Sequence, residues 1–139
     1  MKDRLGRFLA AQQGDYQTAL QEIRAGQKRS HWMWYIFPQA AGLGYSEMAQ
    51  YYAIQDMDEA KAYLQQETLR GHLLEISQAL LDLASDDAAA IMGWPDNLKL
   101  KSSMTLFALA EPECAVFQKV LDKFFQGEMD ARTVELLSI

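Results

Sequence analysis

The chain has 139 residues, of which 13 are Lys or Arg and 19 are Asp or Glu, so its formal net charge is −6. This length suits one domain, residues 1–139, and half of the residues are hydrophobic, which excludes intrinsic disorder. The longest apolar run, Trp32 to Pro38, is about a third of the roughly 20 residues that a bilayer crossing needs, so we expect no membrane association. The single cysteine, Cys114, excludes an internal disulfide framework and favours a reducing cytoplasm.

The charge is unevenly distributed along the chain. Residues 1–34 carry six positive and three negative side chains, residues 35–98 carry two and ten, and residues 99–139 carry five and six. The acidic middle argues against nucleic-acid binding, which relies on many cations that face phosphates. Two histidines and one cysteine show no metal-ligand spacing, so we expect neither a metal site nor a bound cofactor.

Helical spacing and capping residues recur over the first half of the chain. Residues 4–12 predict a short helix, and Asp15 is placed to cap a second helix that ends at Gly26. Ser46 and Asp58 are placed to cap two further short helices. The best candidate for a strand in this half, residues 35–37, is short and shows no period-two alternation.

The second half of the chain predicts longer helices. The clearest covers residues 67–84, where five apolar residues share one face and His72 lies on the opposite, solvent-facing side. A short turn is predicted over residues 87–92. Further helices are predicted over 97–109 with Asp96 as the cap, between Pro112 and Gly127, and after Asp130 as the cap. We therefore predict an all-α fold, a single compact domain of seven to nine short helices.

Two stretches depart from this amphipathic spacing, and the first covers residues 29–46. It holds four aromatic residues within positions 32–37, a basic residue and a hydroxyl just before them, and two glycines after them. Aromatic residues outside a regular stripe bury large areas but need partners for their polar tips. The candidate ligand-binding residues here are Arg29, Ser30, Trp32 and Trp34. His31 is the candidate catalytic base, because histidine titrates near neutral pH, and a packed structural histidine is the alternative.

The second stretch covers residues 94–107. Its two lysines lie four positions before a hydroxyl residue each, so every such pair shares one side of a helix. Lysines and hydroxyls near the start of a helix can hold a phosphate or a carboxylate. The candidate ligand-binding residues are Lys99, Lys101, Ser102 and Ser103. The alternative is a capped helix with solvated lysines, because Asp96 competes for the free amides.

These two stretches also carry a family resemblance. The runs RSHWMWYIFPQ and GLG, and later PDNLKLKSSMTLF, resemble the signature of the domain-of-unknown-function 1810 family, and the similarity extends over nearly the whole chain. Family members are small, mainly helical bacterial proteins, some of which carry the label calpastatin. The resemblance implies an all-α protein in a bacterial cytoplasm and brings no established activity. A fainter similarity, over residues 54–64, is to YbiA-like N-glycosidases, which act on ADP-ribose-type compounds.

Three functions remain open at this point. The first is a small-molecule site for an anionic, nucleotide- or phosphate-containing ligand, formed by both stretches. If the protein is an enzyme, the second resemblance implies hydrolysis of N-glycosidic bonds, with His31 or a carboxylate activating water. The second function is a protein-interaction module anchored by exposed aromatic residues. In the third, the aromatic residues are only core. The sequence leaves the oligomeric state open.

Overall fold

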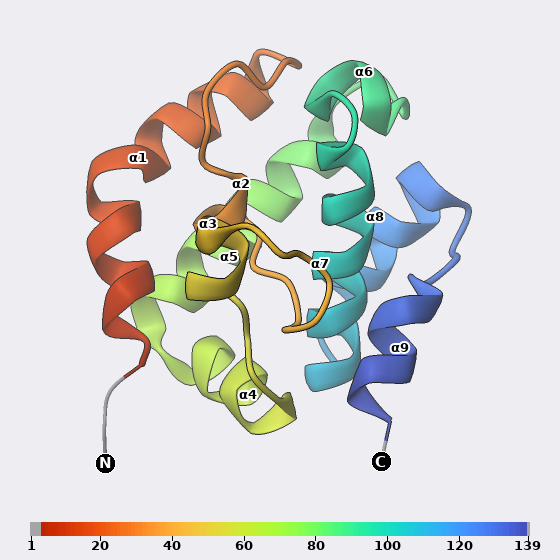
Figure 1. Ribbon diagram of the computed structural model, residues 1–139. Helices are drawn as coiled ribbons and strands as arrows, with labels where there is room; N and C mark the ends of the chain where they lie inside the picture. Colours follow the sequence, from red (N-terminus) through yellow and green to blue (C-terminus); the bar gives the residue numbers. More distant parts are fainter. Residues whose placement is uncertain (1–3, 139) are drawn as a thin grey trace.

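Helices of very different length follow one another along the chain. A computed structural model describes residues 4–138, which form helices and no strand (Figure 1). The helices are α1 (Gly6–Arg24), α2 (Met33–Ile36), α3 (Glu47–Tyr51), α4 (Met57–Gln65), α5 (Glu67–Asp82), α6 (Ala88–Met92), α7 (Asp96–Ala110), α8 (Ala115–Phe125) and α9 (Ala131–Leu137). The prediction of an all-α fold with seven to nine helices is confirmed, although α1, α5 and α7 are not short. None of the helices within 4–138 is long and apolar enough to cross a membrane.

The first helix is longer than predicted. The sequence suggested two helices separated near Asp15, but α1 runs through this point without a break. Its residues Phe8, Tyr16, Leu20 and Ile23 are all buried and continue one apolar stripe across the expected boundary. Asp15 does not cap a helix, because its carboxylate instead accepts a hydrogen bond from the Tyr35 hydroxyl.

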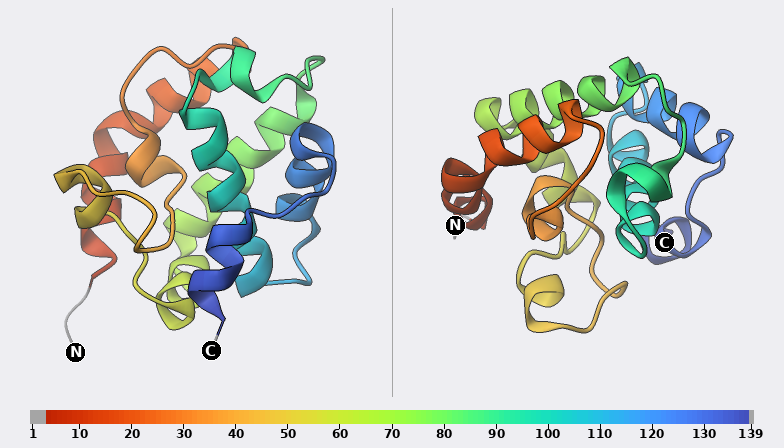
Figure 2. Two further views of the ribbon diagram at one scale, coloured as in Figure 1. Left: turned by 45° about the vertical axis from the view of Figure 1, so that its right-hand side comes forward. Right: turned by 90° about the horizontal axis from the view of Figure 1, so that it is seen from above.

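α1 and α5 lie side by side and form the rear layer of the molecule (Figure 2). The rings of Tyr16 and His72 stack between these helices with their centroids 3.7 Å apart. His72 Nδ1 also lies 2.8 Å from Gln12 Oε1. The prediction that His72 is solvated is therefore wrong, because α1 covers the face of α5 that the sequence assigned to solvent.

α7 is the central helix of the fold. It packs against α4, α6, α8 and α9 and runs through the middle of the view in Figure 1. Its buried residues lie on all sides of the helix rather than on one stripe, and they include Ser102, Ser103 and Thr105. Because neighbouring helices surround α7 in this way, it has no wide solvated face. The helix that the sequence predicted to be amphipathic is exposed only near its start.

Local capping chemistry explains where most helices begin. Ser46 and Asp130 each accept a hydrogen bond from the backbone N–H three residues later, as the sequence predicted. Asp87 caps α6 in the same way, where the sequence predicted only a short turn. α4 begins earlier than expected, because Asp56 rather than Asp58 provides the cap. Residues 35–37, the strand candidate, belong to the short helix α2 and its end.

Residues 41–53, here called the front loop, leave the helical body and return to it (Figure 2). The backbone closes its base: Ala41 N donates to Ile54 O and Ile54 N donates to Gln39 O, both at 2.8 Å. The loop contains α3 and projects in front of the helices. Its ends are therefore fixed while its middle lies against solvent and α7.

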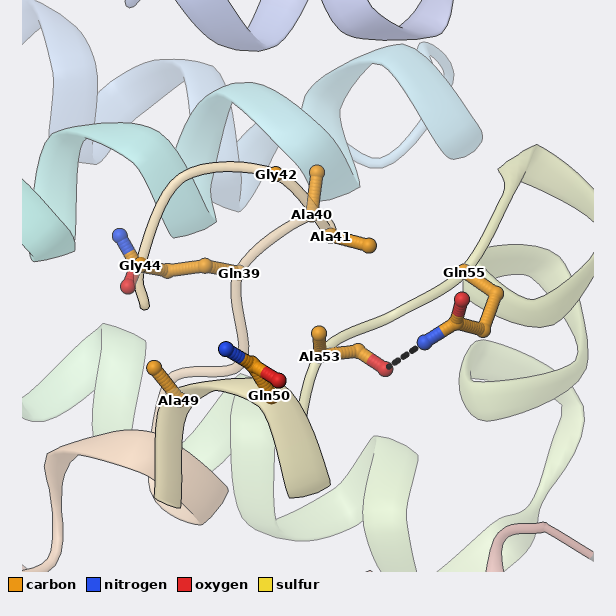
Figure 3. A pocket seen from close by; sticks show the side chains of 9 residues that line it. All are labelled: Gln39, Ala40, Ala41, Gly42, Gly44, Ala49, Gln50, Ala53 and Gln55. Atoms are coloured by element: carbon orange, nitrogen blue, oxygen red, sulfur yellow. Dashed lines mark hydrogen bonds between the residues drawn. The ribbon is translucent and has the colours of Figure 1, made fainter. Parts of the chain in front are cut away.

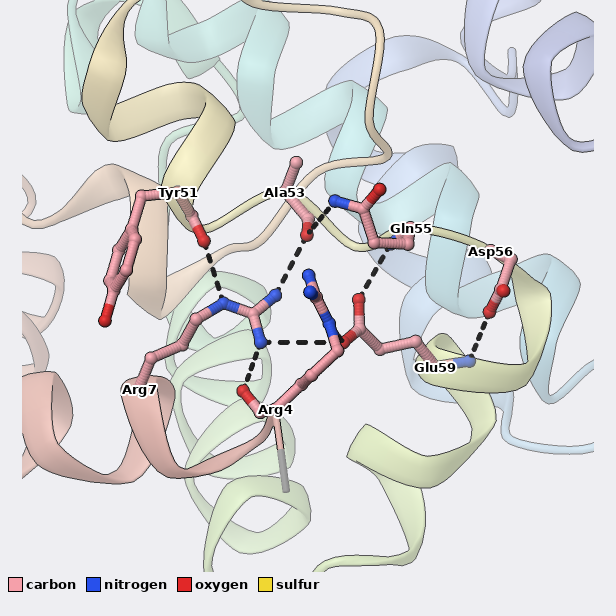
Figure 4. Close-up of polar contacts among 7 residues, drawn as sticks. All are labelled: Arg4, Arg7, Tyr51, Ala53, Gln55, Asp56 and Glu59. Carbon is pink, nitrogen blue, oxygen red and sulfur yellow. Dashed lines mark hydrogen bonds and ion pairs between the residues drawn. The ribbon is translucent and has the colours of Figure 1, made fainter. Parts of the chain in front are cut away.

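Arg7 of α1 holds the returning end of the front loop (Figure 4). Its side chain, only 8% exposed, donates from Nε to Tyr51 O at 2.8 Å and from Nη2 to Ala53 O at 2.9 Å. The guanidinium also lies 3.5 Å from Glu59, whose other oxygen accepts from Gln55 N at 2.7 Å. A planar group with donors in a fixed fork is well suited to joining these three segments.

Candidate functional site

A cavity of about 370 Å³ lies between the front loop and the start of α7. It brings together the two stretches that the sequence singled out, although some fifty positions separate them. One wall comes from Gln39, Leu43, Gly44, Tyr45, Ser46 and Ala49, and the other from Pro95, Leu98, Lys99, Ser102 and Asp130. Because neither stretch forms the cavity alone, its existence depends on how the front loop is fixed.

A second cavity, of about 290 Å³, adjoins the first one and shares Gln39, Gly44 and Ala49 with it (Figure 3). Three glutamine side chains line it, those of Gln39, Gln50 and Gln55. Gln50 Nε2 donates to Tyr45 O at 2.7 Å, and Gln55 Nε2 donates to Ala53 O at 3.3 Å. We call the two adjoining cavities the front cleft. Its amide groups can both donate and accept hydrogen bonds.

Glycine at position 44 is required by the close approach of α3. A Cβ atom at Gly44 would lie 2.7 Å from the Cβ of Ala49, which is much closer than two carbon atoms can pack. Gly42, two residues earlier, has a φ of +100°, a conformation that favours glycine. Gly44 therefore shapes the wall that both cavities share, and Gly42 lines only the second cavity.

Lys99 supplies the positive charge of the front cleft. Its ammonium lies 3.4 Å from Asp96 Oδ1 and 5.7 Å from the centroid of a Trp34 ring. The other oxygen of Asp96 is 2.9 Å from Lys28 Nζ, whose side chain is 8% exposed. One carboxylate therefore faces two ammonium groups here, and Asp130, which lines the same cavity, supplies a second carboxylate.

The backbone amides of Asn97 and Leu98, at the start of α7, are not available to a ligand. Asn97 N donates to Gly93 O, and Leu98 N donates to Pro95 O, both at 2.9 Å. Asp96 is the first residue of the helix rather than its cap, and Pro95 has no N–H. An anion in the front cleft would thus meet the Lys99 side chain and not the free amides that the sequence suggested.

Ser30 and Trp32 belong to a turn that closes on Glu22 rather than to the front cleft. Glu22 accepts hydrogen bonds from Arg29 N, Ser30 N, Ser30 Oγ and Trp32 Nε1, at 2.5–2.9 Å. Burial of this carboxyl raises its pKa, but the four donors outweigh burial and lower the pKa to about 2. Trp32 is 1% exposed and forms part of the core.

Three other candidates lie away from the cleft walls. The side chains of Arg29 and His31 are exposed and line neither cavity, while the His31 carbonyl accepts from the Tyr35 hydroxyl at 3.3 Å. Ser103 is fully buried, and its Oγ has no hydrogen-bond partner among the described residues. The roles of Arg29 and His31 in a ligand site or in catalysis stay predictions, and we leave them out of the proposed site.

Lys101 points away from Lys99, although the two residues were expected to act together. Its ammonium pairs with Glu128 Oε1 at 3.1 Å and lies 6.0 Å from the centroid of the Phe125 ring. Residues two apart on an α-helix are separated by roughly 200° around its axis. Ser102 does line the cleft, where its hydroxyl donates to Leu98 O at 3.2 Å.

Sequence reasoning missed several residues of the cleft. Asp130 was identified only as a cap, and the structure shows that this residue also lines the cavity together with Ser102 of α7. Within residues 4–138, the exposed large hydrophobic residues come from two short segments that each contribute residues to the cleft: Tyr45, Met48, Tyr51, Trp94 and Leu98. Tyr45 and Trp94 each lie next to a glycine or a proline, and this is the signal that was available for these two residues.

Comparison with known proteins decides the family. The family model described as "Protein of unknown function (DUF1810)" matches residues 2–137, nearly the whole chain. The chain belongs to the DUF1810 family. This confirms the resemblance on which the sequence analysis relied, and it assigns no activity to the DUF1810 fold.

A solved structure shows the same DUF1810 fold. The crystal structure of the conserved hypothetical protein Rv1873 from Mycobacterium tuberculosis is 44% identical in sequence, with a TM-score of 0.95. The match covers 97% of this chain and 96% of that one. No match to a curated protein was found. Within residues 4–138, no group of three or more His, Cys, Asp or Glu side chains is arranged to hold a metal ion.

Proposed function

We propose that the front cleft of this DUF1810 protein binds a small nucleotide-like ligand whose phosphate or other anionic group lies at Lys99. The observation that carries the proposal is that the two family motifs line one cavity, and that Lys99 is among the residues of its wall. A concave site with apolar walls and a few polar groups is the usual form of a ligand pocket. The single cysteine agrees with the reducing cytoplasm that we propose as the setting.

The walls of the cleft suit the two ends of such a ligand. Tyr45 is 83% exposed and lines the cavity next to Lys99, so its ring is free to stack on a base. The amides of Gln39 and Gln50 face the adjoining cavity, where they can bind the polar edge of a heterocycle. Trp32 and Trp34 are not needed for stacking in this arrangement.

The experiment is a thermal-shift screen of nucleotides and ADP-ribose, followed by calorimetric titration of any ligand that stabilises the protein. We expect Lys99→Met to weaken binding about tenfold or more, because a charge-assisted contact is lost. Lys119→Met, at an exposed lysine of α8, is the matched control and should leave the affinity unchanged. The absence of any stabilising compound, or equal effects of the two substitutions, would contradict the proposal.

A hydrolase that cleaves N-glycosidic bonds is the second candidate, and Asp130 favours it. One oxygen of its carboxylate accepts from Thr133 N and Thr133 Oγ1, at 3.0 and 2.5 Å, so the other is free to activate water. Release of free base from nucleosides or ADP-ribose, followed by chromatography, tests this candidate. Activity that is lost in Asp130→Asn and kept in His31→Gln would assign the carboxylate, and the reverse pattern would assign His31.

A protein-interaction module is the third candidate, and the exposed residues at the rim of the cleft favour it. Tyr45 and Trp94 are 83% and 78% exposed, and large aromatic side chains are frequent anchors of interfaces. A pull-down with the wild type and with Trp94→Ala distinguishes this candidate from a small-molecule site. A partner that only the wild type retains, together with no response to nucleotides, would favour the module.

A further inference from the structure

A third cavity, of about 490 Å³, lies where α6, the start of α7 and the end of α8 meet. Leu98 lines this cavity as well as the front cleft, so the two sites lie on either side of one residue of α7. Lys101 and Asn97 face this cavity and not the cleft. We call it the α6–α8 cavity. Its volume is in the range of sites that hold small ligands.

One polar atom in this cavity lacks a partner. Asn97 Oδ1 is buried, and it accepts no hydrogen bond from any of the described residues. A buried acceptor that is left unpaired costs about 1–3 kcal/mol, so native proteins rarely tolerate one without a reason. Because this oxygen is closed off from solvent, a ligand with a hydrogen-bond donor would remove the penalty once the Asn97 side chain rotates toward the cavity.

The charged residues around the cavity are of both signs, and two of the four cap the ends of helices. Lys123 Nζ donates to the carbonyl oxygens of Leu80 and Leu81 at 3.0 Å and to that of Leu83, so it caps the end of α5. Asp87 accepts from Ala90 N at 3.1 Å and caps α6. The charges left for a ligand are therefore one cation, Lys101, and one anion, Asp86.

Both of these charged groups can change partner. The side chain of Lys101 is 19% exposed, while that of Glu128, with which it pairs, is 75% exposed. Such surface ion pairs contribute little, so a ligand carboxylate can replace Glu128. Asp86 is exposed and makes no hydrogen bond or ion pair within residues 4–138. The Asp86 carboxylate would repel a purely anionic ligand, and the Lys101 ammonium would repel a purely cationic one.

We propose that the α6–α8 cavity binds a small zwitterion with an apolar side chain, of the class of the α-amino acids. The ligand carboxylate pairs with Lys101, and its ammonium donates to Asn97 Oδ1 and faces Asp86. The apolar side chain packs on Leu98 and Phe125, which line the same cavity. This proposal does not depend on the function proposed for the front cleft.

The test is a titration of the isotope-labelled full chain, followed through its backbone amide NMR signals, with three probes of one shape. L-phenylalanine carries both charges, phenethylamine only the ammonium, and 3-phenylpropionate only the carboxylate. We expect L-phenylalanine to shift the signals of residues 86–89, 97–101 and 123–126, and to bind at least tenfold more tightly than either analogue. Equal binding of the three probes, or no shift up to the solubility limit, would overturn the proposal.

Two substitutions locate the charges separately. In Lys101→Met, L-phenylalanine should bind no better than phenethylamine, and in Asp86→Asn the advantage of L-phenylalanine over 3-phenylpropionate should shrink severalfold. Lys99→Met, on the same helix but facing the front cleft, is the control and should change none of these ratios. The amide spectrum of each variant shows that it is folded. An unchanged preference for L-phenylalanine in Lys101→Met would contradict the assignment.

Discussion

The ammonium of Lys99 lies 5.7 Å from the centroid of a Trp34 ring, which joins the aromatic stretch near the N-terminus to the central helix α7. A cation over an indole ring is held by the electrostatic field of the ring and by the shared exclusion of water. The contact positions Lys99 at the wall of the front cleft. It also gives Trp34 a role beneath the lysine, rather than on the surface that a ligand would meet.

The three tryptophans should differ sharply in their contribution to stability. Trp32 is 1% exposed, so Trp32→Ala should lower the free energy of unfolding by about 3–5 kcal/mol through cavity formation. Trp94 is 78% exposed, so Trp94→Ala should change it by only about 0.5 kcal/mol. Chemical denaturation measures both values. A similar loss in the two variants would show that Trp32 is not a core residue.

Acid should destabilise the protein partly through Glu22. Its pKa is lowered from 4.5 to about 2 in the folded state, so its contribution to stability is complete above pH 4.5 and is lost as the pH falls toward 2. Glu22→Gln should be less stable at pH 7 by about 1–3 kcal/mol and should show a flatter dependence on pH below 4.5. Urea denaturation at several pH values tests this. An unchanged slope in Glu22→Gln would assign the acid sensitivity to other groups.

Two glycine substitutions should have opposite effects. A Cβ at Gly44 would lie 2.7 Å from Ala49, so Gly44→Ala should move α3 and alter the front cleft. Gly71 lies inside α5 with nothing within 4 Å of its added Cβ, so Gly71→Ala should stabilise the helix by about 0.5–1 kcal/mol. Melting temperatures and amide spectra measure the two effects. A Gly44→Ala variant with unchanged signals for residues 41–53 would contradict the close approach.

The Arg7 side chain should control the order of the front loop. Lysine cannot reproduce its donors to both Tyr51 O and Ala53 O, so Arg7→Lys should lower stability by about 1–3 kcal/mol. Amide hydrogen exchange over residues 49–55 should accelerate more than exchange in α5. The control is Arg4→Lys, because the Arg4 side chain is 47% exposed and should contribute much less. Equal rates of amide exchange over residues 49–55 in both variants would show that Arg7 does not hold the front loop.

The pKa of His72 can be tested by NMR titration. Burial against α1 lowers the pKa of His72 from its ordinary 6.5, and the nearby Glu75 carboxylate offsets part of this effect. The folded state therefore binds a proton at His72 less readily than the unfolded state, so this residue should favour folding above pH 6.5 and lose that effect as the pH falls through the lowered pKa. His72→Gln should remove this part of the pH dependence. A His72 pKa at or above 6.5 would contradict the buried stack on Tyr16.

The helices were predictable to the extent that their causes are local. Ser46 and Asp130 cap helices where the sequence placed them, because a side chain that bonds the N–H three residues later needs no distant partner. The predictions of local structure were wrong where residues distant in the sequence bind or pack against the segment. Asp15 bonds to Tyr35 instead of capping a helix, and residues 35–37 are held in and beside a short helix by the core around Trp32 and Phe37.

The sequence by itself determined an all-α chain and marked both segments that line the front cleft, because periodicity, caps and unusual aromatic density are local properties. Only the tertiary structure decided that Ser30 and Trp32 close on Glu22, and that Lys99 and Lys101 face two different cavities. It also added Asp130 to the cleft, from a segment far along the chain. The physical reason is that the positions of side chains around a cavity follow from the packing of several helices, and no single helix encodes that packing.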